Sequence, residues 1–425
     1  MSIDYELTLM LNKTMKRREF IIFVIIMVVV YFLYQFITDS LVFNSPVINP
    51  NDLINKKQVS PQELYDRSWK MIKKDYIDSS YNSQNWNKWR GKYRGKLKTD
   101  EDARVAIETM VASLDDVYTR FLTKSEYAEQ YNSIDSHITG IGVNIMNQSG
   151  KTVIYSVIEG TPAEQYGLRA NDIVLYVDGK SVSGLDIAKV AELVRGKENT
   201  YVTLKIKRGK YIITKKIIRK KIEIKSVESS IKKGNIGYIK VKSFIGSNTA
   251  SDFVSALKTV NHTKGLIIDL RGNTGGLLTN AVIVANLFIN DGKIVSIVSK
   301  NGKKNDINAQ LSVPVVNKPT VVLVDGASAS ASEILSGALK DNHKAVLVGS
   351  RTFGKGLVQQ IVPLPNGTGL NITIAKYLTP NGTDINKKGI EPDYKADYTL
   401  ADLKKHNDTQ LKKAEEVLND LCVAK

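Results

Sequence analysis

The chain has 425 residues, with 60 Lys and Arg against 43 Asp and Glu and a formal net charge of +17. This length predicts two or three domains, and 42% hydrophobic with 24% charged residues excludes a mostly disordered chain. The single cysteine, Cys422, excludes an intrachain disulfide framework. The four scattered histidines lack metal-ligand spacing, so we predict neither a metal site nor a cofactor.

An apolar run from Phe20 to Ile37 is the first strong feature of the chain, with Gln35 as its one polar side chain. A helix of this length crosses a bilayer core of ~30 Å at ~1.5 Å per residue. Basic residues precede the run and Asp39 follows it, so the positive-inside rule places the N-terminus in the cytoplasm. The alternative is a cleaved signal peptide. However, the run is longer than the apolar core of a typical signal peptide, and no small-residue cleavage site follows it.

We therefore predict a single-pass protein of the cell membrane, with its N-terminus in the cytoplasm and its main domains outside. This location disfavours nucleic acid as the partner of the excess positive charge. An anionic surface of lipid or wall polymer is favoured instead.

Composition and periodicity divide the remaining chain. Ser60 and Pro61 start a region of helical spacing, short β-branched runs between glycine turns follow, and strands then alternate with helices in an α/β pattern. The predicted segments are a cytoplasmic tail (1–19), a transmembrane anchor (20–38), a linker (39–60), an N-terminal helical region (61–134), a small β domain (138–220), an α/β core (225–395) and a C-terminal amphipathic helix (396–425).

Turn signals mark the small β domain. Gly160-Thr161-Pro162-Ala163 predicts a short helix that opens at the proline, Gly167 predicts its end, and Asp178-Gly179 predicts a tight turn after a strand. This succession resembles a PDZ domain. The alternative is an ordinary β domain whose glycines only shape turns.

The PDZ resemblance implies a loop whose backbone N–H groups bind the C-terminal carboxylate of a peptide. The peptide would then add as a strand on the adjacent sheet edge. The implied loop residues are Gly140, Ile141, Gly142 and Val143.

The segment from Val324 to Glu333 joins a predicted strand to a predicted helix through small residues. Such a turn places a serine hydroxyl at a helix N-terminus, where the dipole favours a developing negative charge. The spacing does not distinguish Ser328, Ser330 and Ser332 as a nucleophile. The alternative is structural, because Ser330-x-x-Glu333 also fits a capping box.

Two side chains compete for the role of base. His343 lies in a polar stretch that is typical of a surface turn at a helix end. Lys355 lies between glycines and precedes a β-branched run, and the glycines let the backbone approach and bury the amine. A lysine acts as a base only if desolvation lowers its pKa from ~10.4. With period two, Gln359 projects to the same face as Lys355 and orients the amine.

From about residue 61 onward, the chain resembles the C-terminal processing peptidases, also called tail-specific proteases. Val117, Gly272 and Thr274 depart from the usual family pattern. The matching motifs are Leu-Asp-Asp-Val-Tyr-Thr-Arg-Phe-Leu (114–122), Asp-Leu-Arg-Gly-Asn-Thr-Gly-Gly-Leu-Leu (269–278), Gly-Ala-Ser-Ala-Ser-Ala-Ser-Glu (326–333), Gly-Ser-Arg-Thr-Phe-Gly-Lys-Gly-Leu-Val-Gln (349–359), Tyr-x-Thr-Pro-Asn-Gly (377–382) and Gly-Ile-Glu-Pro-Asp (389–393).

This resemblance implies a role for each site residue. Ser330 is the nucleophile, Lys355 the general base and Gln359 the residue that orients it. The backbone N–H groups of Gly276 and Ala331 form the oxyanion hole. Asp341 is assigned to a relay in some such families, although the residues themselves give no physical need for it.

The sequence thus predicts an α/β catalytic core of sheet-and-helix layers with an inserted, β-sandwich-like PDZ domain, an N-terminal helical region and one transmembrane helix. The expected function is that of a membrane-anchored serine endopeptidase that binds substrate C-termini and forms an acyl-enzyme through a Ser–Lys dyad. A catalytically silent PDZ scaffold and a Ser–His hydrolase are the alternatives. Protein or peptide substrates are the expected partners, and the sequence leaves open a homodimer or a regulatory partner.

Overall fold

The computed structural model describes residues 58–423, apart from 135–136, 224, 311–314, 400–401 and 403–406. The predicted transmembrane segment at Phe20–Ile37 lies outside this range. Among the helices that are described, none has the length and apolar character required to span a bilayer. The described residues form two compact units. The larger one combines those up to residue 131 with those from 225 onward, and the smaller one lies within residues 132–224.

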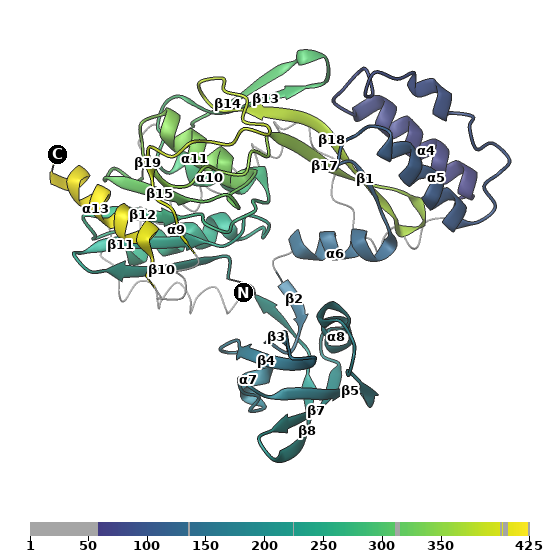
Figure 1. Ribbon diagram of the computed structural model, residues 1–425, viewed down its shortest axis with the longest axis horizontal. Helices are drawn as coiled ribbons and strands as arrows, with labels where there is room; N and C mark the ends of the chain where they lie inside the picture. The colour runs from purple at the N-terminus through teal and green to yellow at the C-terminus, as the bar shows by residue number, and fades with distance from the viewer. Residues whose placement is uncertain are drawn as a thin grey trace, which may run out of the picture. The chain divides into compact units, whose positions relative to one another are not determined.

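A six-stranded sheet forms the centre of the larger unit (Figure 1). Five neighbouring strands run parallel and β10 pairs antiparallel at one edge. Both faces are buried, which explains the nearly continuous apolar runs of the inner strands. The strands in sheet order are β10 (Val227–Lys232), β11 (Ile236–Val241), β12 (Gly265–Asp269), β15 (Thr320–Val324), β16 (Val346–Gly349) and β19 (Tyr394–Lys395).

Helices cover both faces of this sheet. Three pack on one face in the main core, namely α9 (Thr249–Thr259), α10 (Leu278–Asn286) and α11 (Ala331–Asp341). The opposite face is covered by α13 (Thr409–Val423), whose Ala414, Val417 and Leu418 pack on the strands. Within the described residues this last helix begins at Thr409 and is shorter than predicted. The Asp408 carboxylate accepts the Leu411 N–H in its first turn at 2.9 Å.

A second sheet in the larger unit is mainly antiparallel, and the N-terminal helices pack beside it (Figure 1). Residues 120–122, predicted as part of a helical region, form a strand that pairs with β18. Ser60 caps the first helix and Pro61 is its first residue, as predicted. The elements are α4 (Pro61–Asp75), η1 (Trp86–Trp89), α5 (Asp100–Ala112), β1 (Arg120–Leu122), α6 (Lys124–Ile134), β13 (Lys293–Ser299), η2 (Lys300–Gly302), β14 (Lys304–Asn308), β17 (Leu357–Pro363), η3 (Pro365–Gly367) and β18 (Gly369–Leu378).

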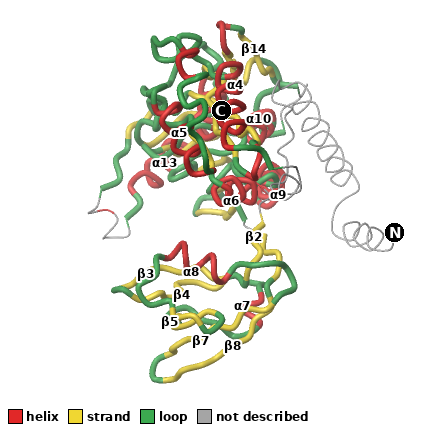
Figure 2. The backbone as a smooth tube through the Cα atoms, turned by 90° about the vertical axis from the view of Figure 1, so that its right-hand side faces the viewer, coloured by secondary structure: helices red, strands yellow, loops and turns green. Residues whose placement is uncertain are grey.

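The smaller unit consists mainly of strands, as Figure 2 shows, with a core of its own. The predicted turns are present, because Pro162 opens a short helix and Asp178 and Gly179 both have positive φ. In the main sheet, β3 lies at one edge and β8 at the other. Its elements are β2 (His137–Gly140), β3 (Val143–Gln148), β4 (Lys151–Val157), α7 (Pro162–Gln165), β5 (Ile173–Val177), β6 (Lys180–Ser181), α8 (Ile187–Val194), β7 (Tyr201–Arg208), β8 (Tyr211–Ile218) and β9 (Lys220–Glu223).

Candidate active site

Ser330 lies in the turn between β15 and α11, immediately before the first helical residue, and its backbone is strained. Its φ of 55° and ψ of −115° form a conformation that residues other than glycine rarely adopt. Strain of this kind costs on the order of 1–3 kcal/mol and concentrates at active sites. The N-terminus of α11 also favours negative charge beside this hydroxyl.

The structure separates the three serines that the sequence leaves equivalent. Ser328 and Ser332 are fully buried. Their hydroxyls donate to the carbonyl oxygens of Leu270 and Asn273, each at 2.9 Å. Ser330 is only partly buried and is the serine with the strained backbone. The other two therefore hold the turn in place, and Ser330 is the candidate nucleophile.

The carboxylate of Glu333 joins the serine turn to the lysine loop. One oxygen accepts the N–H groups of Ser330 at 2.9 Å and of Lys355 at 2.8 Å. The other accepts the Thr352 hydroxyl at 2.6 Å and the Gly354 N–H at 2.7 Å. The glutamate half of the predicted capping box is thus present, but this fully buried side chain also fixes the loop that carries Lys355.

The Tyr377 hydroxyl makes a second bridge between the same segments. It donates toward the carbonyl oxygen of Ser330 at 3.1 Å and toward that of Lys355. Burial, together with the nearby Glu333 charge, raises the pKa of Tyr377 well above its ordinary value, so the hydroxyl keeps its proton. The backbone of the nucleophile and that of the lysine are therefore held together at two points.

Lys355 lies in the loop before β17, where its side chain is partly buried. Burial lowers the pKa of the Lys355 ammonium, while the charges of Asp116 and Glu333 act in the opposite direction. The close approach predicted at the flanking glycines is present, because a Cβ atom at Gly354 would lie 2.8 Å from the Gly389 nitrogen. The amine thus has the desolvated surroundings that a lysine base requires.

Gln359 contributes a buried side-chain nitrogen that has no hydrogen-bond partner among the described residues. An unpaired buried donor costs about 1–3 kcal/mol, so this atom is available to a lysine amine or a substrate. Lys355 lies two residues before β17, and Gln359 lies within that strand. That the two side chains share one face, with Gln359 orienting the amine, stays a prediction.

The loop after β12 packs against the serine turn at the start of α11, and within the described residues each of the two segments has an unpaired amide group. Gly275 and Gly276 have φ values of 98° and 146°, and the Gly275 carbonyl accepts the Phe244 N–H at 2.9 Å. A Cβ atom at Gly275 would lie 2.9 Å from the Ala331 nitrogen. Within the described residues, no hydrogen bond uses the N–H of Gly276 or of Ala331. Free amides beside a nucleophile are the components of an oxyanion hole.

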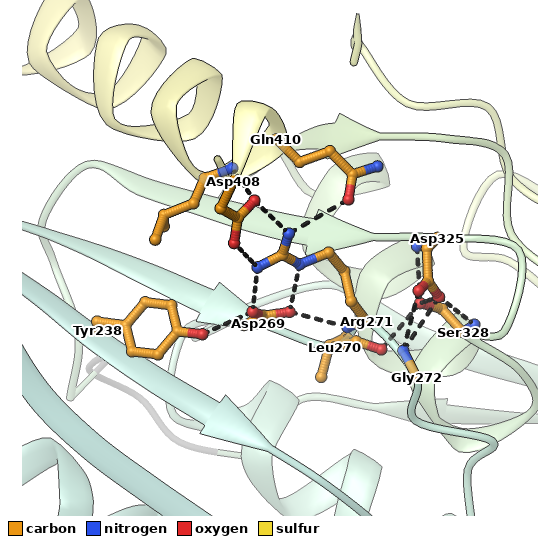
Figure 3. A network of polar contacts seen from close by, with 10 residues as sticks. Tyr238, Asp269, Leu270, Arg271, Gly272, Asp325, Ser328, Asp408 and Gln410 are labelled. Atoms are coloured by element: carbon orange, nitrogen blue, oxygen red, sulfur yellow. Dashed lines mark hydrogen bonds and ion pairs between the residues drawn. The ribbon is translucent and has the colours of Figure 1, made fainter. Parts of the chain in front are cut away.

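Arg271 fixes the start of this loop, as Figure 3 shows. Its guanidinium pairs with both oxygens of Asp269, at 3.0 and 2.7 Å, and with both oxygens of Asp408, at 2.7 and 2.9 Å. The next residue, Gly272, donates its N–H to the Asp325 carboxylate at 3.1 Å. The loop is thus tied to β12, to the start of α13 and to the serine turn.

The comparisons with known proteins agree with this geometry. A model of peptidase family S41 matches residues 235–396, and a PDZ-domain model matches residues 153–208. The carboxyl-terminal-processing protease of Synechocystis sp. is 35% identical over 343 residues, which cover 78% of this chain and 80% of the relative. The chain belongs to peptidase family S41.

Two further S41 proteases are similar to it. The carboxy-terminal processing protease CtpA of Bacillus subtilis is 40% identical over 306 residues, covering 71% of this chain and 65% of that protein. The solved structure of a photosystem II D1 C-terminal processing protease matches with a TM-score of 0.54 and 33% identity, over 80% of this chain and 94% of that one. The protein is a carboxyl-terminal-processing serine protease with a PDZ domain, and it acts on protein substrates.

In this S41 protease, Asp341 and His343 lie at the opposite end of α11 from Ser330. At ~1.5 Å per residue, the helix separates the two ends by about 16 Å. The Asp341 carboxylate accepts the Asn381 N–H at 2.9 Å, and His343 is exposed in a turn. This placement gives neither side chain a route to the serine hydroxyl and favours Lys355 as the base.

The predicted carboxylate loop of the PDZ domain connects β2 to β3. Gly142 has a φ of 90°, and a Cβ atom there would overlap the Thr161 side chain. The carbonyl groups of Ile141 and Gly142 accept the N–H groups of Ala163 at 2.7 Å and Ile158 at 2.9 Å. These two hydrogen bonds hold the loop against the rest of the domain, and β3 beside it is an edge strand.

Proposed function

We propose that this protease captures the C-terminal tail of a protein on its PDZ domain and cleaves the chain through a Ser330–Lys355 dyad, with the enzyme anchored to a membrane. The observation that carries the dyad is the shared Glu333 oxygen, which accepts the N–H groups of both residues. The Tyr377 bridge adds a second link between them.

In this mechanism the neutral Lys355 amine accepts the Ser330 proton as the serine oxygen attacks the peptide carbonyl. The N–H groups of Gly276 and Ala331 stabilise the oxyanion. The lysine ammonium then returns the proton to the leaving amine, and an acyl-enzyme remains. Lys355 next accepts a proton from the water that attacks the ester, and its ammonium returns that proton to the Ser330 oxygen as the new C-terminus leaves.

A binding-only PDZ scaffold was the alternative function. Nothing in the site favours it, because a scaffold has no use for the backbone strain at Ser330 or for a desolvated lysine. The other alternative, a Ser–His hydrolase with His343 as the base, conflicts with the position of that residue beyond the end of α11.

C-terminal recognition is tested with matched substrate peptides that have a free or an amidated C-terminus. Amidation removes the charge and one acceptor oxygen, and charge-assisted hydrogen bonds are worth ~1.5–3 kcal/mol. We expect the amidated peptide to bind about ten-fold more weakly or worse, measured by calorimetry on a Ser330→Ala variant.

Two loop variants provide the control for this prediction. Gly142→Val should weaken binding of the free peptide, because the new side chain overlaps Thr161. Gly150→Val changes a positive-φ glycine of the same domain with open space around it and should leave the affinity unchanged. Equal affinity for both peptides contradicts carboxylate capture.

An anionic-surface role is supported by the hairpin of β7 and β8. Residues 201–221 contain nine basic residues and no acidic residue. The strand pairing places Tyr176 opposite Lys205 and Lys207 opposite Ile212, so basic, aromatic and apolar side chains share the outer face. Lysines near an anionic lipid surface contribute ~1 kcal/mol each, and tyrosines favour the interface.

Vesicle flotation distinguishes membrane binding by the anchor from membrane binding by this basic face. The full-length chain should float with zwitterionic vesicles even at high salt. A chain lacking residues 20–37 should float only with phosphatidylglycerol vesicles at low salt, and Lys205→Glu, Lys207→Glu and Lys216→Glu together should abolish that binding. The matched control reverses Lys70, Lys74 and Lys88, three exposed lysines of the larger unit. If neither triple variant loses binding to the phosphatidylglycerol vesicles, the role of the basic face is contradicted. If the full-length chain fails to float with zwitterionic vesicles, the anchor is contradicted.

A further inference from the structure

The N-terminal motif at residues 114–122 forms a turn that reaches the catalytic lysine. The Asp116 carboxylate accepts the Tyr118 N–H at 3.0 Å and the Thr119 hydroxyl at 2.7 Å. The Thr119 hydroxyl in turn accepts the N–H of Thr373 in β18 at 3.0 Å. This turn, outside the matched S41 region, is therefore attached firmly to the sheet that follows the lysine loop.

The Tyr118 ring is what the turn presents to the site. The Lys355 nitrogen lies 4.8 Å from the centre of this ring, within cation–π range. In the described part of the chain, the amine has no ion pair and no hydrogen bond. Among the described residues, the Tyr118 ring is therefore the group that holds the amine.

Unpaired polar atoms lie on the strands beside the turn. Gln359 and Thr373 are partners across β17 and β18. The Gln359 side-chain nitrogen and the Thr373 hydroxyl are both buried, and neither has a hydrogen-bond partner in the part of the chain that the structure describes. Since Thr373 is bonded to Thr119, these two atoms are close to the element that carries Tyr118.

We propose that Tyr118 is a positioning residue for Lys355, so that the turn at residues 116–119 is part of the active site. The ring binds the ammonium form through its negative face and keeps the long side chain in one place. It has less attraction for the neutral amine, which is then free to accept the Ser330 proton. The inference rests on the proposed Ser330–Lys355 dyad.

The charged and titratable groups around the amine define the expected pH effect. Asp116 on the turn and Glu333 on α11 favour the ammonium, and burial opposes it. The Tyr118 ring also favours the ammonium form, so its removal should lower the pKa of Lys355. Burial and the Asp116 charge raise the pKa of Tyr118, so its hydroxyl stays neutral while Lys355 titrates.

The test compares Tyr118→Phe, which keeps the ring, with Tyr118→Leu, which removes it. For the full chain and a peptide substrate, kcat and KM are measured as a function of pH. Tyr118→Phe should keep the wild-type pH midpoint and at least half of kcat. Tyr118→Leu should lower kcat about ten-fold at unchanged KM, and its midpoint should move down by about 0.5–1 pH unit. Val105→Ala, at an exposed position on α5 and outside the turn, should behave as wild type.

Two results would overturn the inference. One is a Tyr118→Leu midpoint equal to that of wild type, because a purely structural role lowers activity without moving the titration of the base. The other is an equal loss in Tyr118→Phe and Tyr118→Leu, which assigns the effect to the hydroxyl. An active Lys355→Ala variant overturns the dyad and this inference together, whereas an inactive one with an unmoved Tyr118→Leu profile overturns this inference alone.

Discussion

Lys355→Ala should reduce cleavage by about 10²–10⁴-fold, the usual contribution of a general base. The alanine removes the proton acceptor but leaves the Lys355 backbone N–H and carbonyl that Glu333 and Tyr377 bind. The fold and peptide binding should therefore stay intact. Steady-state cleavage, calorimetry with a tail peptide and thermal unfolding of the same preparation measure the three quantities.

Two more variants make the assignment specific. Lys355→Arg should also be inactive, because a guanidinium with a pKa above ~12 does not release its proton. His343→Ala should cleave at the wild-type rate, since it lies beyond the far end of α11. Full activity in Lys355→Ala, or an inactive but folded His343→Ala, would return the histidine to the role of base.

The pH profile follows from the same assignment. Only the neutral amine accepts the serine proton, so kcat/KM should rise with pH through the pKa of Lys355. Burial lowers this pKa, so the rising limb should lie below the range of an ordinary lysine, ~10.4. A limb centred near 6.5 would indicate a histidine instead.

The sequence predicts the α/β core well because its strands are short apolar runs with clear ends. The predicted alternation of strands and helices is present, and the predicted strand and helix flank the serine turn, because β15 ends at Val324 and α11 begins at Ala331. β1 was missed because three residues between a turn and a helix carry no periodic signal. Its partner, β18, lies some 250 positions further along the chain, and local sequence does not contain that pairing.

The active site is less visible in the sequence, because its contacts join distant segments. A capping box explains Ser330 and Glu333 locally, and only the fold brings Thr352, Gly354 and Lys355 onto the same carboxylate. The three serines of the turn look alike until two of them meet carbonyl groups some 58 positions away. Tyr377 was noted as part of a motif, but its bridge to the site depends on the register of β18.

Gly275→Ala should abolish activity almost completely. A Cβ atom at this position would lie 2.6 Å from the Ala329 carbonyl oxygen and 2.8 Å from the Ser330 Cβ atom. These contacts are shorter than real Cβ atoms show, so the oxyanion loop or the serine turn must move. A displacement of ~1 Å at a catalytic site costs about 100-fold in rate, and this variant moves both the nucleophile and an amide donor.

Gly272→Ala is the matched control for this prediction. Gly272 has a φ of 74° in the same loop, but a Cβ atom there has nothing within 4 Å. An alanine in a left-handed backbone conformation costs ~1–2 kcal/mol, so this cause should lower the free energy of unfolding of both variants by similar amounts. Only Gly275→Ala adds the clash with the serine turn, and it should therefore lose far more kcat than its drop in melting temperature explains. Similar kcat values for the two variants would show that the loop accommodates the extra carbon and that its contact with the nucleophile is not critical for catalysis.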